Sequence, residues 1–205
     1  MAINNVQNID VLIGRSVLSL ETANKLGEIH DLAVDPSNWE LAGFSIRLLD
    51  ERYALVNYQN VHSIGPDALM IDDEESLLST DQSQIKSLPL AKNSLLGVKV
   101  ITELGQLIGK VSNIFIHLKD TPDFIYEVRR SIFDKLLGHT FYFPASLGCA
   151  ISEDRSSLVV SHDPEKMEHS LDAVAKRLYG PNEPAPYEPA ASVQVTVRSQ
   201  RLTPN

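Results

Sequence analysis

The sequence predicts a mainly β protein: two tandem small β-barrels, followed by a C-terminal amphipathic helix and a disordered tail. Three observations carry this prediction. Apolar stretches are short and are separated by turn residues at intervals of roughly ten residues, which is typical of small barrels. The same order of stretches occurs twice along the chain. A helix-forming segment and then a proline-rich segment follow the second copy.

The internal repeat sets the domain organisation, because a fixed period marks repeated structural units. Four blocks recur in the same order, at offsets of 83, 82, 82 and 86 residues: 12–17 with 95–100, 25–34 with 107–116, 43–47 with 125–129, and 54–58 with 140–144. We therefore expect two related modules of similar length.

Within each module the pattern predicts five or six short strands. In the first module they are expected at 17–20, 29–34, 41–48, 53–58 and 69–71, with the turn 35–38 between the second and third. Closure into a barrel would remove the strand edges that such apolar strands otherwise expose. Glycines at 14, 27, 97 and 109 fit turns or sharply coiled barrel corners.

These residues resemble the PRC-barrel family. The resemblance rests on Gly14-Arg15-x-Val17, the block 25–32, and Val61-x-x-Ile64, and in the second copy on 107–111 and 143–147. It spans about residues 11 to 161. The family is named for a domain of the photosynthetic reaction-centre H subunit and also occurs in the ribosome maturation factor. The resemblance implies small β-barrels that act as adaptors in assembling complexes, without a shared catalytic site.

The expected domains are as follows: a first PRC-barrel at 1–75, a linker at 76–93, a second PRC-barrel at 94–161 with an inserted short helix at 131–138, a C-terminal helix at 162–180, and a proline-rich, disordered tail at 181–205. Ser131 and Asp134 resemble a capping box at the start of the inserted helix, and Gly138 suits its end. Asp163-Pro164 favours a helix start, and an apolar stripe follows at Met167, Leu171, Val174 and Leu178.

The net charge of -9 is unevenly distributed. Residues 1–80 contain 13 acidic and 4 basic residues, whereas residues 81–205 contain 14 of each. Nucleic-acid binding needs clustered Lys and Arg, so the composition disfavours it. The chain begins without the basic flank and apolar run of a secretory signal, and no stretch is apolar enough to span a membrane. We expect a cytoplasmic protein, with peripheral attachment to a membrane complex and homo-oligomerisation left open.

The sequence offers no convincing catalytic, cofactor or metal site, so we expect no enzyme. Cys149 is the only cysteine, which excludes an intrachain disulfide and a thiolate metal site, and its apolar neighbours favour a buried thiol. The six histidines are scattered. Neither a Gly-x-Ser-x-Gly elbow nor a phosphate-binding glycine loop occurs. The acidic run 72–75 is interpreted as solvated linker, with cation binding as the alternative.

Protein–protein interaction is the better functional class. The candidate partner contacts are Trp39, Arg129, Arg130, Ile132, Phe133 and Leu136. Trp39 follows a turn, where it either faces a partner or packs across a barrel mouth. The inserted helix either covers the barrel core or faces a partner. We expect a non-catalytic adaptor or assembly protein, by resemblance in a photosynthetic or other membrane-associated complex. The alternative is a factor of the ribosome-maturation type that binds a ribosomal protein.

Overall fold

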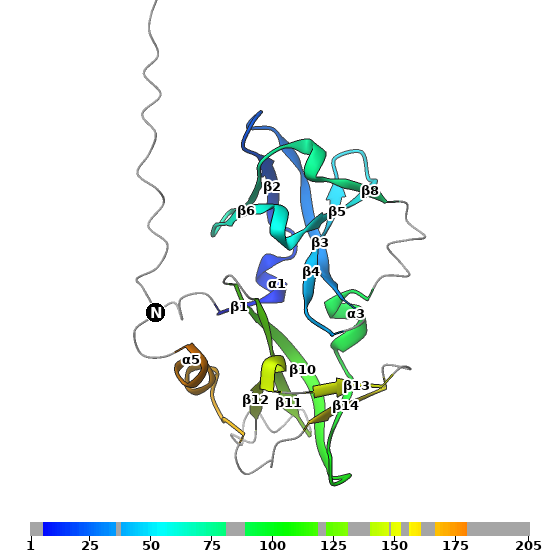
Figure 1. Ribbon diagram of the computed structural model, residues 1–205, viewed down its shortest axis with the longest axis vertical. Helices are drawn as coiled ribbons and strands as arrows, with labels where there is room; N and C mark the ends of the chain where they lie inside the picture. Colours follow the sequence, from blue (N-terminus) through cyan, green and yellow to red (C-terminus); the bar gives the residue numbers. More distant parts are fainter. Residues whose placement is uncertain are drawn as a thin grey trace, which may run out of the picture.

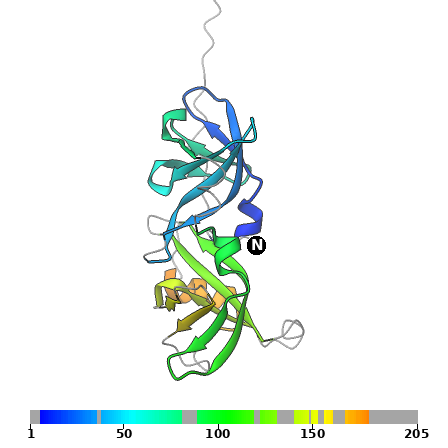
Figure 2. The ribbon, with the colours of Figure 1, turned by 90° about the vertical axis from the view of Figure 1, so that its right-hand side faces the viewer.

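The computed structural model describes residues 6–35, 38–80, 89–118, 122–130, 140–147, 149–152, 156–160 and 167–179. The chain is mainly β and forms two mixed sheets that follow one another along the long axis of the molecule (Figures 1 and 2). In this part of the chain, no helix combines the length and apolar character that crossing a bilayer requires.

The first sheet has the strand order β6-β7-β2-β3-β4-β5-β8. Its strands are β2 (Ser16–Ser19), β3 (Lys25–Val34), β4 (Leu41–Leu48), β5 (Tyr53–Asn57), β6 (Val61–Ile64), β7 (Ala68–Ile71) and β8 (Leu78–Thr80). Helix α1 (Ile9–Leu12) precedes the sheet, and two 3-10 turns, η1 (Tyr58–Asn60) and η2 (Glu74–Ser76), connect its later strands. Strand β8 lies in the segment expected to be a linker and pairs with β5.

The second sheet has the order β12-β11-β10-β9-β14-β13. Its strands are β9 (Lys99–Thr102), β10 (Leu107–His117), β11 (Asp123–Arg129), β12 (Phe141–Pro144), β13 (Cys149–Ile151) and β14 (Ser157–Val160). Helix α3 (Ala91–Leu95) precedes the sheet, and the 3-10 turn η3 (Ala145–Leu147) lies between β12 and β13. A seventh strand, β1 (Val6–Asn8), comes from the start of the chain and pairs with β10.

The repeat in sequence corresponds to a repeat in topology. Six equivalent strands lie in the same order in both sheets, and two of them pair in parallel in each, β2 with β7 and β9 with β14. The remaining strands, β8 and β1, have no counterpart in this order. Gly14 and Gly97, which are 83 residues apart, both have a positive φ. The last matched block needs a correction of one residue: Val56 lies opposite Phe44 and Phe143 opposite Tyr126, so the offset there is 87.

The predicted closed barrels are not observed, because the hydrogen bonds among the described strands close neither sheet. In the first sheet the strands on either side of η1, β5 and β6, are not paired; in the second the same holds for β12 and β13 around η3. In each sheet a 3-10 turn separates the two strands, and the strand that follows it has only three or four residues. Each sheet is therefore open at the equivalent place.

Two glycines are required by close strand contact. A Cβ added at Gly27 would lie 2.2 Å from the Arg47 carbonyl oxygen, and one added at Gly109 would lie 2.5 Å from that of Arg129. Neither neighbour can give way, because both are backbone atoms of the adjacent strand. These two expected corner glycines therefore permit the tight coiling of each sheet.

One continuous apolar core runs through both sheets and across the place where they meet. The first sheet contributes Val17, Ile29, Phe44 and Val56, among others, and the second contributes Val100, Ile114, Tyr126 and Leu158. The helices α1 and α3 add Ile9, Leu12, Ala91 and Leu95. The two modules consequently share a core instead of having one each.

The C-terminal helix α5 (Leu171–Tyr179) begins later than the sequence predicts. Glu168 forms an isolated bridge with Tyr142, so the chain is extended there, and the Ser170 hydroxyl accepts a hydrogen bond from Ala173 N at 3.2 Å. Val174 of the helix packs with Val6 and Ile125 on the outer face of the second sheet. The expected start at Asp163, the inserted helix 131–138 and the tail 181–205 lie outside the described residues.

Candidate functional site

At the junction, where the two modules meet, the segment that leads into each module pairs its backbone with a strand of the other module. Asn8, ahead of α1, pairs with Phe115 of β10, while Leu90, ahead of α3, forms a bridge with Ala33 of β3. Asn8 and Leu90 are 82 residues apart in sequence, and so are Ala33 and Phe115. Each module thus receives the entry segment of the other, as in an isologous contact between two subunits.

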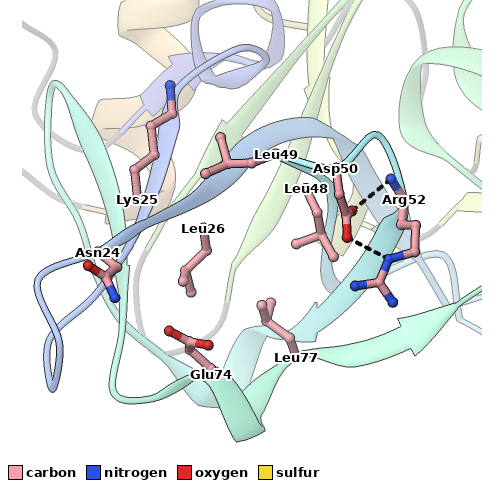
Figure 3. A pocket seen from close by; sticks show the side chains of 9 residues that line it. All are labelled: Asn24, Lys25, Leu26, Leu48, Leu49, Asp50, Arg52, Glu74 and Leu77. Atoms are coloured by element: carbon pink, nitrogen blue, oxygen red, sulfur yellow. Dashed lines mark hydrogen bonds and ion pairs between the residues drawn. The ribbon is translucent and has the colours of Figure 1, made fainter.

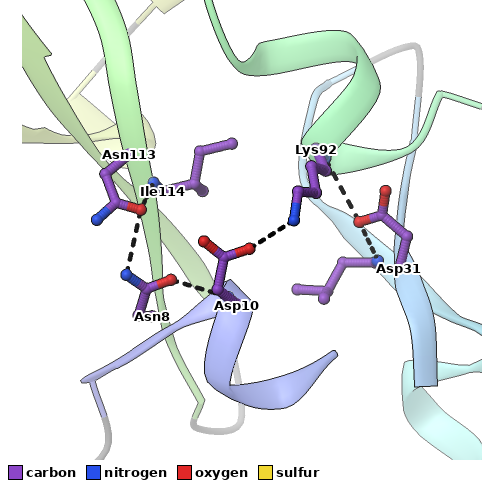
Figure 4. A network of polar contacts seen from close by, with 7 residues as sticks. Asn8, Asp10, Asp31, Lys92, Asn113 and Ile114 are labelled. Carbon is purple, nitrogen blue, oxygen red and sulfur yellow. Dashed lines mark hydrogen bonds and ion pairs between the residues drawn. The ribbon is translucent and has the colours of Figure 1, made fainter. Parts of the chain in front are cut away.

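A polar network follows the same approximate two-fold relation (Figure 4). The ion pair between Lys92 Nζ and Asp10 Oδ1, 2.8 Å long, joins equivalent positions of α3 and α1. Asp31 and Asn113 also occupy equivalent positions, next to register shifts in β3 and β10. Both side chains of this pair accept a hydrogen bond from the following backbone N–H, at 2.7 Å in the first module and 2.9 Å in the second.

The two halves of this network differ in charge. Asp31 is a carboxylate that is only 3% exposed, and its Oδ1 also accepts from Lys92 N at 3.4 Å. Asn113 is a neutral amide that accepts from Asn8 Nδ2 at 3.2 Å. Burial raises the pKa of the Asp31 carboxyl, and the hydrogen bonds from Leu32 and Lys92 oppose this to a smaller extent. The junction therefore contains one buried acid where its counterpart uses an amide.

A pocket of about 610 Å³ lies at the end of the first module, between the β2–β3 turn, the β4–β5 turn and η2 (Figure 3). We call it the distal pocket. Its apolar lining consists of Leu26, Leu48, Leu49 and Leu77. Three of these leucines are partly buried and pack on the main core, whereas Leu49 is 67% exposed. The core of the first module therefore reaches solvent at this pocket.

Charged side chains form the rim of the distal pocket. Lys25 is paired with Glu28 at 2.8 Å, and Arg52 with Asp50 at 2.7 Å. The hydrogen bond from Lys25 lowers the pKa of Glu28, and that from Arg52 lowers the pKa of Asp50. Glu74, in the first turn of η2, completes the rim. The leucine lining inside this charged rim is suited to hold an apolar group.

A second polar cluster surrounds Glu127 on the outer face of β11. Its carboxylate accepts hydrogen bonds from Ser112 Oγ at 3.0 Å and Tyr142 OH at 3.1 Å, and it pairs with Arg129 Nη2. Burial, followed by the charge of Glu127, raises the pKa of Tyr142 to about 12. Because Glu127 is buried and fully engaged, this cluster fixes the sheet instead of presenting a reactive acid.

The structure places three of the predicted contact residues. Trp39 is partly buried against the core with φ +61°, which agrees with the packing alternative. Arg129 is engaged with Glu127. Arg130 is exposed, and its Nε donates to the Ile108 carbonyl oxygen at 3.0 Å. The other three, Ile132, Phe133 and Leu136, lie outside the described residues.

The side chains do not assemble a catalytic triad around His30. Ser45 Oγ lies 3.4 Å from His30 Nδ1, but Asp31 is directed to backbone N–H groups at the junction. Among the residues described, no three His, Cys, Asp or Glu side chains come together in a way that could hold a metal ion.

No family model matches the chain, and no curated protein matches it.

Sequence reasoning did not find the distal pocket. Its leucines come from three separate places, around 26, 48 and 77, and none forms a motif. One local signal was present: Leu49 continues an apolar strand directly into the turn at Asp50, where a polar residue is the norm.

Proposed function

We propose that the protein is a non-catalytic adaptor built from two PRC-type modules, which binds other proteins during the assembly or stabilisation of a complex. By resemblance, a photosynthetic or other membrane-associated complex is the proposed setting. The residues that carry the resemblance lie before and on β2, on β3 and on β6 in the first module, and on β10, β12 and η3 in the second. The common strand order of the two sheets supports a shared module type.

The observation that carries the proposal is that the two modules share one core, while their far ends carry different side chains. Reciprocal pairing at the junction holds the modules in one arrangement. At their far ends, equivalent positions differ in chemistry: Leu48 corresponds to Arg130, and Lys25 to Leu107. A rigid pair of related modules that present different surfaces can hold two partners in a fixed relation.

Affinity capture tests this function. The tagged full-length chain is used as bait in native lysate of the source organism, with quantitative mass spectrometry and an unrelated tagged β protein as the control bait. We expect a small, reproducible set of proteins in amounts comparable to the bait. The absence of any protein enriched over the control bait, also after mild crosslinking, contradicts the adaptor function.

A further inference from the structure

We propose that the distal pocket binds a basic segment of a partner protein, with one large apolar side chain in the pocket and Lys or Arg residues over its rim. This inference rests on the proposed adaptor function and names the chemistry of one partner.

The pocket has the size and lining for a large apolar side chain. Its volume of about 610 Å³ falls within the roughly 300–1,000 Å³ that ligand pockets span. Leu26, Leu48 and Leu77 form its inner wall and are continuous with the core, and Leu49 extends that wall into solvent. Covering exposed leucine surface is favourable at about 25 cal/mol per Å² of apolar area removed from water. An apolar anchor therefore supplies the binding energy.

The charge around the pocket selects a basic partner. Both lining cations are already neutralised, Lys25 by Glu28 and Arg52 by Asp50. Glu74 has no such counter-ion among the described residues. The lining residues, their ion-pair partners and the chain neighbours of Glu74 comprise five carboxylates, Glu28, Asp50, Asp73, Glu74 and Glu75, and two cations, Lys25 and Arg52. The surplus is negative, so Lys or Arg residues beside the anchor gain complementary contacts.

The polar groups of the pocket argue against a small polar ligand. Such ligands are held by a few convergent donors and acceptors inside a concave site. Here the carboxylate of Asp50 and the guanidinium of Arg52 bond to each other at the edge, as Figure 3 shows. The inner wall is made of leucine side chains. This division into an apolar interior and a charged edge is the anatomy of a protein–protein contact.

At the equivalent end of the second module, two of the described positions carry side chains that differ in chemistry from those of the pocket. Arg130 stands at the position of Leu48, and its guanidinium is bonded to the Ile108 carbonyl oxygen. Leu107 stands at the position of Lys25. The second module does expose leucine at this end, since Leu104 is 96% exposed. That residue provides a matched control, because it is an exposed leucine in a turn without the acidic rim.

Selection from a random 12-residue peptide library displayed on phage, with the full chain as target, tests the inference. We expect the selected peptides to contain a large apolar residue flanked by Lys or Arg. Their affinity, measured by fluorescence anisotropy of synthetic peptides, should fall at least tenfold in Leu49→Ser and several-fold in Glu74→Lys. It should remain within twofold in Leu104→Ser. Binding should also weaken as salt is raised from 50 to 300 mM, because charge complementarity is screened.

Three outcomes overturn the inference: selected peptides that are neutral or acidic, affinity that Leu49→Ser leaves unchanged, or equal loss in the Leu104→Ser control. Leu49 and Glu74 are exposed, so neither substitution endangers the fold, and thermal unfolding of each variant verifies this. The affinity capture separates the two proposals. If the Leu49→Ser bait recovers every partner of the parent chain, the adaptor function stands and the pocket is not its contact. If the parent chain recovers none, the adaptor function itself fails.

Discussion

Replacing the buried acid at the junction should stabilise the protein. In Asp31→Asn the amide oxygen retains the acceptor role towards Leu32 N and Lys92 N, as Asn113 shows for the equivalent position. The variant loses only the buried charge. Weaker hydrogen bonds to a neutral acceptor cost about 0.5–1 kcal/mol, whereas relief of the desolvated charge returns roughly 2–3 kcal/mol. We expect a net gain of about 1–2 kcal/mol at pH 7, which raises Tm by about 3–6 °C for a chain of this size.

The pH dependence identifies the cause. Burial raises the pKa of Asp31 in the folded state, so the folded state binds more protons than the unfolded one between the two pKa values. The parent chain therefore loses stability relative to Asp31→Asn as pH rises through this interval. Below the unfolded pKa of about 3.9 both forms are neutral and the advantage of the variant disappears.

Thermal unfolding followed by circular dichroism at pH 4 and pH 7 measures both effects. The reciprocal variant Asn113→Asp is the control, because it adds a carboxylate at the equivalent position and should lower Tm at pH 7. The reasoning is refuted if Asp31→Asn lowers Tm at pH 7, or if its difference from the parent chain is the same at both pH values.

Three other predictions concern the coiled sheets and the shared core. Gly27→Ala should destabilise the fold by about 3 kcal/mol or more, since its Cβ would lie 2.2 Å from the Arg47 carbonyl oxygen; urea unfolding measures this. In an ultraviolet titration of the parent chain, one tyrosine should ionise near pH 12, and Tyr142→Phe should remove that step. If the variant instead loses a step near pH 10, the contact between Tyr142 and Glu127 is contradicted. The two modules expressed as separate chains should each be unfolded by circular dichroism but fold when mixed; an independently folded module would show that the shared core is dispensable.

The sequence predicted most of the strands because their determinants are local. Alternation, turn residues and the repeat placed β4 at its observed bounds and found the later part of β3, which begins four residues earlier than predicted. The corner glycines Gly27 and Gly109 proved sterically necessary. Trp39 illustrates a limit, since its turn position was compatible with either exposure or packing. The interactions that decided between them come from the core, which the local sequence does not encode.

The junction and the distal pocket escaped prediction for a different reason. Val6–Asn8 is a three-residue strand whose partner lies more than 100 residues away, and such a short segment has no pattern of its own. Its partner could be chosen only by the docking of whole modules. The extended backbone at Glu168, inside the predicted helix 162–180, has a similar cause, because Glu168 pairs with Tyr142, which is distant in sequence. Non-local pairing thus explains each of these failures.

The contrast between the junction and the far ends bears on what the two modules are for. At the junction, equivalent positions make equivalent contacts: Asn8 and Leu90 both pair across it, and Asp10 and Lys92 meet near its approximate axis. At the far ends, some equivalent positions differ in charge and polarity, as Leu48 and Arg130 illustrate. Stability requires the junction, since the core passes through it, but nothing in the fold requires the ends to differ. Two copies serving only as structural support would have no physical reason to differ at these positions. That difference is what separate binding partners would demand.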